Sequence, residues 1–449
     1  MGKVEPPSTE GGSPVATAEI VTIGDELLLG HTLDTNAAFI SRMLGRIGIR
    51  VVRRTTVGDA EPAIAAAVQN ALERATIVIC TGGLGPTQDD VTRPALAALF
   101  EAPLEVRSDV LDVLRERYRV RGIPMPERNI TQAQVPRGAV VLPNANGTAP
   151  GLVLRREHRL CILLPGVPHE LQALMVDQVL TCIQKESANT QSMAPANPIR
   201  YRVLRTTGIA ESLLAEKVDH ILPDLAPLTL ASLPGFAGTD LRLTSWGELT
   251  SDRADQALEG AVQRIRAELH SHIYGEDGDE LAAVVGLAMR EHGWRITVAE
   301  SCTGGLLGKL LSDAPGASDY FTGGVIAYSN ALKLSQLNVS PLTLETFGAV
   351  SEDVAREMAM GAQRLGNADA AIAVTGIAGP GGGSKDKPVG TVWLAAALHD
   401  ELQTRRIILP GDRNEIRERA AYAGLALLWK MLRATGAHAG SANSARGIA

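Results

Sequence analysis

Several apolar runs in this chain end abruptly in turns rich in glycine, and segments with helical periodicity follow them. The first block holds three such runs, at 18–23, 51–55 and 76–80. Helices are predicted after them, at 36–47, 62–74 and 92–100. Strands that alternate with helices form a parallel sheet with right-handed crossovers. We therefore predict an α/β fold in which the carboxyl ends of the strands share one rim, where open sheets bind their ligands.

Polar stretches divide the 449 residues into blocks. A chain of this length is expected to form about three domains. We predict a disordered arm at 1–17, a polar linker at 184–197 and a disordered tail at 437–449. The folded blocks are predicted at 18–185, 198–275 and 279–436. The first and third blocks carry the parallel α/β pattern, and the third predicts three layers. The βαββα order of the second block predicts a small α+β domain.

Composition excludes several classes of protein. The net charge is −7 and no long basic block occurs, which argues against direct nucleic-acid binding. With 5 Phe, 4 Trp and 6 Tyr, no aromatic stacking platform is expected. The 4 cysteines are scattered, which excludes a disulfide scaffold. No apolar run reaches the roughly 18 residues of a membrane span, and the first residues lack a signal-peptide core, so we expect a cytoplasmic protein.

Two turns of the first block combine glycines with carboxylates after a strand, at 24–26 and 81–90. Glycines let backbone N–H groups approach an anion, and carboxylates can hold Mg²⁺ against phosphate oxygens. Tight turns with solvated acids are the alternative. Neither a complete G-x-x-x-x-G-K-[ST] nor a complete G-x-G-x-x-G occurs, so the turns match no standard phosphate-binding motif.

In the third block, Ser301 follows a predicted strand and precedes Gly304 and Gly305. We predict that it begins a helix, where backbone N–H groups could stabilise an oxyanion. A capping serine is the alternative. Cys302 is a rival nucleophile, but neighbouring side chains on a helix point about 100° apart, so only one can face a pocket.

A serine nucleophile needs a base, and among the titratable residues of this block a lysine is the best candidate. None of the 9 histidines lies in a glycine-rich turn of this block, and G-x-S-x-G is absent. Lys333 lies just beyond the strand predicted at 324–328, next to the Ser301 strand, where burial could depress its pKa. Tyr328 and Asn330 could orient it. A solvated helix lysine is the alternative.

A long glycine-rich loop at 375–384 suits a phosphate or an amide substrate, with a flexible hairpin as the alternative. Arg413 and Arg417, at the start of the last predicted helix, could pair with a 5′-phosphate. Ordinary surface charge is the alternative for each arginine.

Four segments of the first block resemble, in order, the molybdopterin-binding-like domain of the competence/damage-inducible protein A (CinA) family. They are 24–36, 81–92, 146–151 and 164–168. The resemblance implies a metal-dependent pyrophosphatase acting on ADP-ribose-like dinucleotides. The nucleotide- or phosphate-binding residues it implies are Gly24, Asp25, Glu26, Asn36, Thr81, Gly82, Gly83, Gly85, Thr87, Gly147, Thr148, Pro165 and Gly166. The metal ligands it implies, for Mg²⁺ or a similar ion, alone or with K⁺, are Asp25, Glu26, Asp89 and Asp90.

The third block resembles the nicotinamide-nucleotide amidase domain of the same family, through segments 299–305, 328–333, 348–351, 375–383 and 411–413. The resemblance implies a homodimer that hydrolyses nicotinamide mononucleotide to nicotinate mononucleotide and ammonia, without a cofactor, in pyridine-nucleotide recycling. It makes Ser301 the nucleophile, Lys333 the base and Tyr328 an assistant. The substrate-binding residues it implies are Thr303, Gly304, Asn330, Thr375, Gly376, Gly379, Arg413 and Arg417.

Two other functions stay open from the sequence. One is a non-catalytic protein of competence or DNA-damage responses, and the other is a pterin- or nucleotide-binding module. A nucleophile and base in one site would favour the amidase, because binding alone needs neither.

Overall fold

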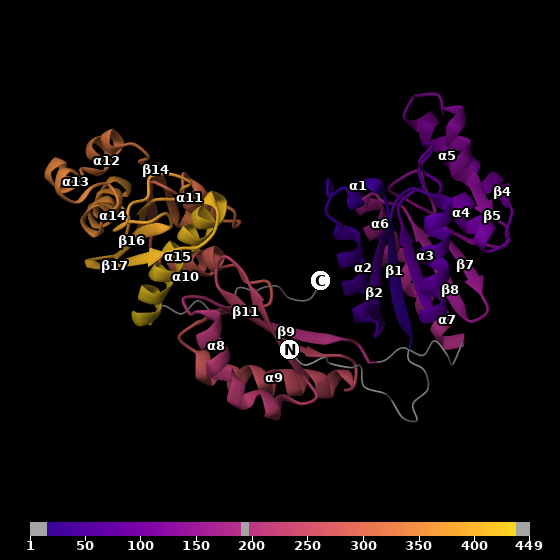
Figure 1. The fold of residues 1–449 in the computed structure, drawn as a ribbon, viewed down its shortest axis with the longest axis horizontal. Helices are drawn as coiled ribbons and strands as arrows, with labels where there is room; N and C mark the ends of the chain where they lie inside the picture. The colour runs from indigo at the N-terminus through magenta and orange to yellow at the C-terminus, as the bar shows by residue number, and fades with distance from the viewer. Residues whose placement is uncertain (1–15, 190–196, 437–449) are drawn as a thin grey trace. The chain divides into compact units, whose positions relative to one another are not determined.

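The computed structural model describes residues 16–189 and 197–436 (Figure 1). The chain divides into two compact units. One comprises the residues up to Arg200 together with Ser245–Gln256, and the other comprises Tyr201–Thr244 and the residues from Ala257 onward. Among the described helices, none has the length and apolar character needed to cross a bilayer.

The first unit is built on a six-stranded sheet with the strand order β2-β1-β3-β8-β7-β6. Its strands are β1 (Thr17–Ile23), β2 (Arg50–Val57), β3 (Ile77–Thr81), β6 (Val140–Leu142), β7 (Gly151–Arg156) and β8 (Arg159–Leu164). β1 runs parallel to β2 and β3, and β3 runs parallel to β8. The predicted parallel sheet is confirmed, and β6 and β7 extend it as antiparallel strands.

Helices cover both faces of this sheet, because its central strands are apolar on both sides (Figure 1). Ile77 and Ile79 of β3 belong to a core that includes α2 and α6. Val78 and Cys80 belong to a second core, with α3, α4 and α5. The helices are α1 (Asp25–Leu28), α2 (Thr35–Arg46), α3 (Glu61–Arg74), α4 (Thr92–Leu99), α5 (Ser108–Val120), α6 (Pro168–Leu174), the π-helix η2 (Met175–Val179) and α7 (Leu180–Asn189).

Some boundaries differ from those predicted. Thr17 opens β1 and Ala16 is buried, so the predicted arm is wrong at its last residues, and 1–15 lie outside the described residues. The predicted linker is wrong over 184–189, which continue α7. Between α4 and β6, the chain makes α5, the 3-10 helix η1 (Glu127–Ala133) and a two-stranded sheet of β4 (Leu104–Val106) and β5 (Gln134–Pro136), none of which was predicted. The predicted tail, 437–449, also lies outside the described part.

A four-stranded sheet with the order β10-β11-β9-β12 follows. Its elements are β9 (Arg200–Thr206), α8 (Glu211–Val218), the 3-10 helix η4 (Asp219–Leu225), β10 (Thr229–Pro234), β11 (Thr239–Ser245), α9 (Ser251–Leu269) and β12 (Ile273–Glu276). The predicted βαββα order is present. β12 was not predicted, because the polar run 275–279, which overlaps its end, was interpreted as a domain boundary. In the structure β12 pairs with β9.

The C-terminal sheet has the order β14-β13-β15-β16-β17, with β13 parallel to β14 and β15. Its strands are β13 (Ile296–Glu300), β14 (Phe321–Ile326), β15 (Ala370–Gly376), β16 (Thr391–Leu398) and β17 (Glu401–Ile408). Its helices are α10 (Leu281–Glu291), α11 (Leu306–Ser312), the 3-10 helix η5 (Ala317–Asp319), α12 (Asn330–Leu337), α13 (Pro341–Phe347), α14 (Glu352–Gly366) and α15 (Arg413–Ala434). Cores on the two faces pack α10, α11 and α15 on one side, and α12 and α14 on the other.

Small residues let α14 approach its neighbours closely. The sheet face below α14 carries Ala371, Ala373, Ala395 and Ala397. On the helix itself, a Cβ at Gly361 would lie 2.0 Å from the carbonyl oxygen of Leu337, at the end of α12. Because that oxygen belongs to the backbone, no side-chain rotation can relieve the clash.

We expect Gly361→Ala to lower the free energy of unfolding by about 1–3 kcal/mol, because the added methyl overpacks the α12–α14 contact. Gly260→Ala on α9 is the matched control, since nothing lies within 4 Å of its Cβ position. The control should raise stability by about 0.5–1 kcal/mol through helix propensity. Urea unfolding of the two variants tests this, and equal shifts in both would contradict the close packing.

Candidate functional site

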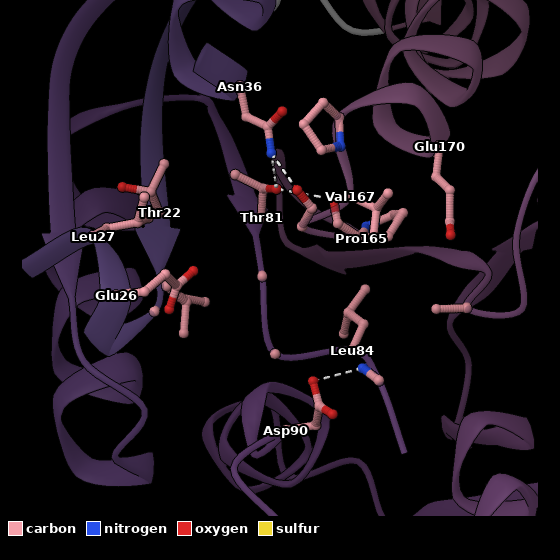
Figure 2. Close-up of a pocket in the computed structure, with 18 of the residues that line it drawn as sticks. Thr22, Glu26, Leu27, Asn36, Thr81, Leu84, Asp90, Pro165, Val167 and Glu170 are labelled. Carbon is pink, nitrogen blue, oxygen red and sulfur yellow. Dashed lines mark hydrogen bonds between the residues drawn. The ribbon is translucent and has the colours of Figure 1, made fainter. Parts of the chain in front are cut away.

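A cavity of about 510 Å³ lies at the carboxyl ends of β1, β3 and β8 (Figure 2). The parallel strand order places three loops around it, 24–36, 81–90 and 165–170. Figure 2 shows Glu26 and Glu170 on opposite sides of the cavity, which therefore lies among loops far apart in the sequence. This is the position in which open parallel sheets bind their ligands.

Most of the residues predicted for this site line the cavity. They are Gly24, Glu26, Asn36, Thr81, Gly82, Gly83, Gly85, Asp89, Asp90, Thr148, Pro165 and Gly166. Three predicted residues are not among its lining. Asp25 is exposed, and its carboxylate accepts the Asp59 N–H at 3.3 Å. Thr87 binds the Asp90 carboxylate instead, and Gly147 is covered by the carboxylate of Glu170.

The lining residues that were not predicted as site residues include the carboxylates Asp34, Asp59 and Glu170 and the amide Gln132. A signal existed for Asp59, because Gly58-Asp59 follows β2 in the same way that Gly24-Asp25 follows β1. Glu170 could also have been predicted, since it lies in the first turn of α6, directly after the turn at 165–168. Gln132 lies in η1, which no pattern predicted.

Short hydrogen bonds hold the loops that border the cavity. The Asn36 side-chain amide donates to the Gly166 carbonyl at 2.7 Å, and the Asn36 Oδ1 atom is buried without a partner among the described residues. Asp90 accepts the N–H groups of Gly85 and Thr87 at 2.6 and 2.8 Å. Beneath the same loop, burial lowers the pKa of the Arg93 guanidinium to about 10. The Asp90 carboxylate therefore stabilises this loop, and the oxygens of Asp90 are less available to a metal.

The cavity has a strongly negative lining. It includes Glu26, Asp34, Asp59, Asp89, Asp90 and Glu170, and among its described lining residues there is no Lys, Arg or His. Burial raises the pKa of Asp59, and the charges of Asp25, Glu26 and Asp89 raise it further. Across the part of the chain that the structure describes, no group of three or more His, Cys, Asp or Glu side chains could hold a metal ion by itself. The predicted four-carboxylate cage is therefore not assembled, while single carboxylates remain suited to a cation that a phosphate ligand brings.

A second site gathers at the carboxyl ends of β13, β14 and β15. Lys333 donates from Nζ to Ser301 Oγ at 3.2 Å and to the Ala327 carbonyl at 2.7 Å. The lysine is only 1% exposed, and burial lowers its pKa. A lysine that loses its proton more easily, next to a serine hydroxyl, has the geometry of a general base and its nucleophile.

Tyr328 lies beside this pair but does not share its proton. Its main-chain carbonyl accepts from Lys333 at 3.4 Å, whereas its hydroxyl accepts from Arg413 at 2.8 Å. Its side chain is 57% exposed. β14 ends at Ile326 rather than at Tyr328 as predicted, and Ser329 caps α12. The predicted orienting role of Asn330 is not visible, because Asn330 is the exposed first residue of that helix.

The prediction that Ser301 begins a helix is wrong, because α11 begins only at Leu306. Gly304 and Gly305, with φ of +62° and +97°, turn the chain between the strand and the helix. The start of α11 is occupied by the buried carboxylate of Glu300. That carboxylate accepts the N–H groups of Gly305, Leu307 and Gly308 at 3.0, 3.0 and 2.8 Å. These N–H groups are therefore not free for an oxyanion.

The other residues predicted to bind an amide substrate surround the pair. Arg413 donates to the Gly379 carbonyl at 2.6 Å, and Arg417 donates to the Thr303 carbonyl at 2.9 Å. Thr375 donates to the Ala349 carbonyl at 2.7 Å. A Cβ at Gly304 would lie 3.4 Å from Arg417, and one at Gly376 would lie 2.8 Å from Val392. Both arginines thus lie against loops of the site.

Cys302 faces away from the lysine. Its side chain belongs to the core formed with α10, α11 and α15, and it is 5% exposed. Burial raises the pKa of its thiol to about 12, so the reactive thiolate is scarce at neutral pH. Of the two rival nucleophiles, the geometry favours Ser301.

Comparison with known proteins extends these observations. Residues 278–432 match the family model "CinA C-terminal domain", residues 19–185 match "Probable molybdopterin binding domain" and residues 201–275 match "Damage-inducible protein CinA KH domain". A CinA-like protein of Gemmatimonas aurantiaca is 46% identical over 91% of this chain and 94% of its own length. A CinA-like protein of Syntrophomonas wolfei is 38% identical over 93% of this chain and 99% of its own length.

A crystal structure of the competence/damage inducible protein CihA from Agrobacterium tumefaciens covers 33% of this chain and 92% of its own, at 40% identity and a TM-score of 0.33. Fold and sites define an α/β protein that joins a molybdopterin-binding-type domain to a domain in which a buried lysine contacts a serine hydroxyl. The chain belongs to the CinA family.

We expect Lys333→Met to change how stability depends on pH. Because the folded state lowers the pKa of Lys333 below 10.5, the folded protein binds fewer protons than the unfolded chain between the two values. The free energy of unfolding of the wild type therefore rises with pH through that window, and the variant loses this rise. The stability of Lys333→Met relative to the wild type should therefore fall as the pH rises from the lowered pKa of the folded state toward 10.5.

Urea unfolding of the full chain at a series of pH values measures this difference. Lys385→Met, at an exposed lysine of the same unit, is the control and should not show it. A difference between Lys333→Met and wild type that stays constant with pH would mean that burial does not perturb Lys333.

Proposed function

We propose that the C-terminal site hydrolyses a carboxamide through Ser301. The observation that carries this proposal is the 3.2 Å contact between Lys333 Nζ and Ser301 Oγ, with the lysine almost fully buried. A binding protein has no need for a buried amine on a serine hydroxyl, because burying such a group is unfavourable unless it is used or well paired.

The chemistry follows from the pair. Neutral Lys333 takes the Ser301 proton as Oγ attacks the carboxamide carbon, and the carbonyl electrons move to the oxygen. The intermediate then collapses: the C–N bond breaks, Lys333 gives its proton to the leaving nitrogen, and ammonia departs. A water molecule attacks the resulting ester while Lys333 takes its proton, and Oγ leaves with that proton. The pair returns to its first state.

Nicotinamide mononucleotide is the substrate we propose, with nicotinate mononucleotide as the product. Its carboxamide suits the serine–lysine pair, and its 5′-phosphate suits a cationic rim. Arg413 and Arg417 supply two such charges on the first turns of α15, beside the loops that hold Thr303 and Gly379. The glycine-rich loop 376–383 adds close backbone approach to the ligand.

We expect purified protein to release ammonia from nicotinamide mononucleotide, and Ser301→Ala and Lys333→Met to lose this activity by a factor of about 10³ or more. Cys302→Ala, which removes the thiol but no peptide N–H, should retain it. An enzyme-coupled ammonia assay, with nicotinate mononucleotide confirmed by mass spectrometry, measures both products. Turnover that depends on Cys302 rather than on Ser301 would reverse the assignment.

A second candidate function belongs to the cavity of the first unit: binding and hydrolysis of a nucleoside diphosphate of the ADP-ribose class. The observation in its favour is the negative lining next to glycine turns. Because six carboxylates and no cationic side chain line the described cavity, an anionic diphosphate would enter together with cations. A Mg²⁺ so carried would meet Glu26, Asp59 or Asp89 and would neutralise the phosphate charge.

We expect cleavage of ADP-ribose to AMP and ribose 5-phosphate to require added Mg²⁺ and to fall by at least about tenfold in Asp89→Asn and Asp59→Asn. Asp177→Asn, at an exposed carboxylate on η2, is the matched control and should leave the rate unchanged. Ser301→Ala should also leave it unchanged, since it tests the other site. Chromatography of the nucleotides follows the reaction, and Mg²⁺-independent cleavage would contradict the cation requirement.

A further inference from the structure

Glu300 is a buried carboxylate next to the nucleophile, and the chemistry above does not use it. It is 1% exposed and ends β13, the central parallel strand of its sheet. Its two oxygens accept three backbone N–H groups at the start of α11, those of Gly305, Leu307 and Gly308. Burying a carboxylate is costly, and three charge-assisted hydrogen bonds with a helix N-terminus offset that cost.

The same contacts define the turn that carries Ser301. At one end of the turn, the Ser301 N–H donates to the Val374 carbonyl at 2.9 Å. At the other end, the Gly305 N–H is held by Glu300, and both Gly304 and Gly305 have positive φ. The turn is thus fixed at both ends, and Ser301 Oγ is held on Lys333.

The hydrogen bonds of this turn also show which donors are left. The Gly304 N–H donates to the Ser301 carbonyl at 3.2 Å. Within 301–305, the N–H groups of Cys302 and Thr303 have no oxygen acceptor among the described residues. The Thr303 hydroxyl is fully buried and likewise lacks a partner in the described chain. A buried hydroxyl without a partner is unfavourable, so a ligand oxygen is the natural partner for the Thr303 hydroxyl and for the two N–H groups beside it.

We propose that Glu300 is a positioning residue: it occupies the start of α11, holds Ser301 against Lys333 and directs the N–H groups of Cys302 and Thr303 to the oxyanion. This inference rests on the amide hydrolysis proposed above. It assigns the oxyanion to the turn itself, where the N–H that follows a nucleophile lies within reach of the developing charge. Glu300 does not touch the substrate and moves no proton.

Glu300→Gln tests this role with little change in shape. The glutamine keeps one acceptor oxygen and turns an NH₂ donor toward N–H donors, so the turn loses part of its anchor. We expect kcat for nicotinamide mononucleotide to fall by at least about tenfold while KM changes by less than about threefold, because the loss falls on the transition state.

A matched control separates positioning from plain destabilisation. Glu357 on α14 is also a carboxylate that accepts a backbone N–H before a helix, that of Ser340 at 2.7 Å, but it lies outside the site. Glu357→Gln should lower the thermal midpoint while leaving kcat unchanged. If Glu300→Gln keeps wild-type kcat, or loses activity only in proportion to its unfolded fraction by circular dichroism, Glu300 is merely structural and the proposal falls.

A substrate-independent measurement distinguishes this failure from failure of the proposed function. Phenylmethylsulfonyl fluoride labels an activated serine: the bond from Oγ to sulfur forms, fluoride leaves and Lys333 takes the proton. Intact-protein mass spectrometry should show labelling at Ser301 that slows at least about tenfold in Glu300→Gln but not in Glu357→Gln. If Glu300→Gln slows labelling but the wild type releases no ammonia, the proposed substrate is wrong and the role of Glu300 stands. If the wild type releases ammonia but Glu300→Gln is labelled at the wild-type rate, the proposed function stands and the role of Glu300 is wrong.

Discussion

The arrangement of the C-terminal site depends on the burial of one amine, that of Lys333. Lys333, only 1% exposed, lies in the first turns of α12, and its partners are a serine hydroxyl and two main-chain carbonyls. Across the described residues no carboxylate forms an ion pair with it, so its environment disfavours the charged form. The strand order makes this possible, because β14 delivers Ala327 and Tyr328 next to the end of β13. Ser301, Lys333 and the loops that hold them therefore come together at one pair of adjacent parallel strands.

The two sites lie at equivalent positions of their sheets, but the charged side chains around them have opposite sign. Each lies where parallel strands end, and each is bordered by glycine turns. The lining of the first cavity is carboxylate-rich, which favours ligands accompanied by cations. The second site carries Arg413 and Arg417, which favour an anionic group brought directly to the protein. Under the two functions proposed above, a chain with few aromatic residues selects its nucleotides by charge and backbone N–H groups rather than by stacking.

Apolar runs were sufficient to predict the parallel sheets, because strands buried on both faces leave an unmistakable signal such as Ile77–Thr81. They were not sufficient for α5, whose mean hydropathy is low, or for β4 and β5, which are only three residues long each. Ser301 and Lys333 could be paired from the sequence, since the strand order follows from chain order. Gln132 could not be placed in the same way, because it lies in η1, which no apolar pattern predicted.

Glu300 illustrates why the position of a helix start is the least predictable part of such a site. Its sequence context, a strand residue followed by serine and glycines, reads as a strand running directly into a capped helix. In the structure, a carboxylate from the last strand residue supplies the cap, and α11 begins five residues after Ser301 rather than at it. A helix start occupied by the protein's own anion cannot also serve a substrate anion. Under the proposed amide hydrolysis, the donors to the oxyanion come from the turn, whose geometry depends on two glycines with positive φ and on a buried carboxylate.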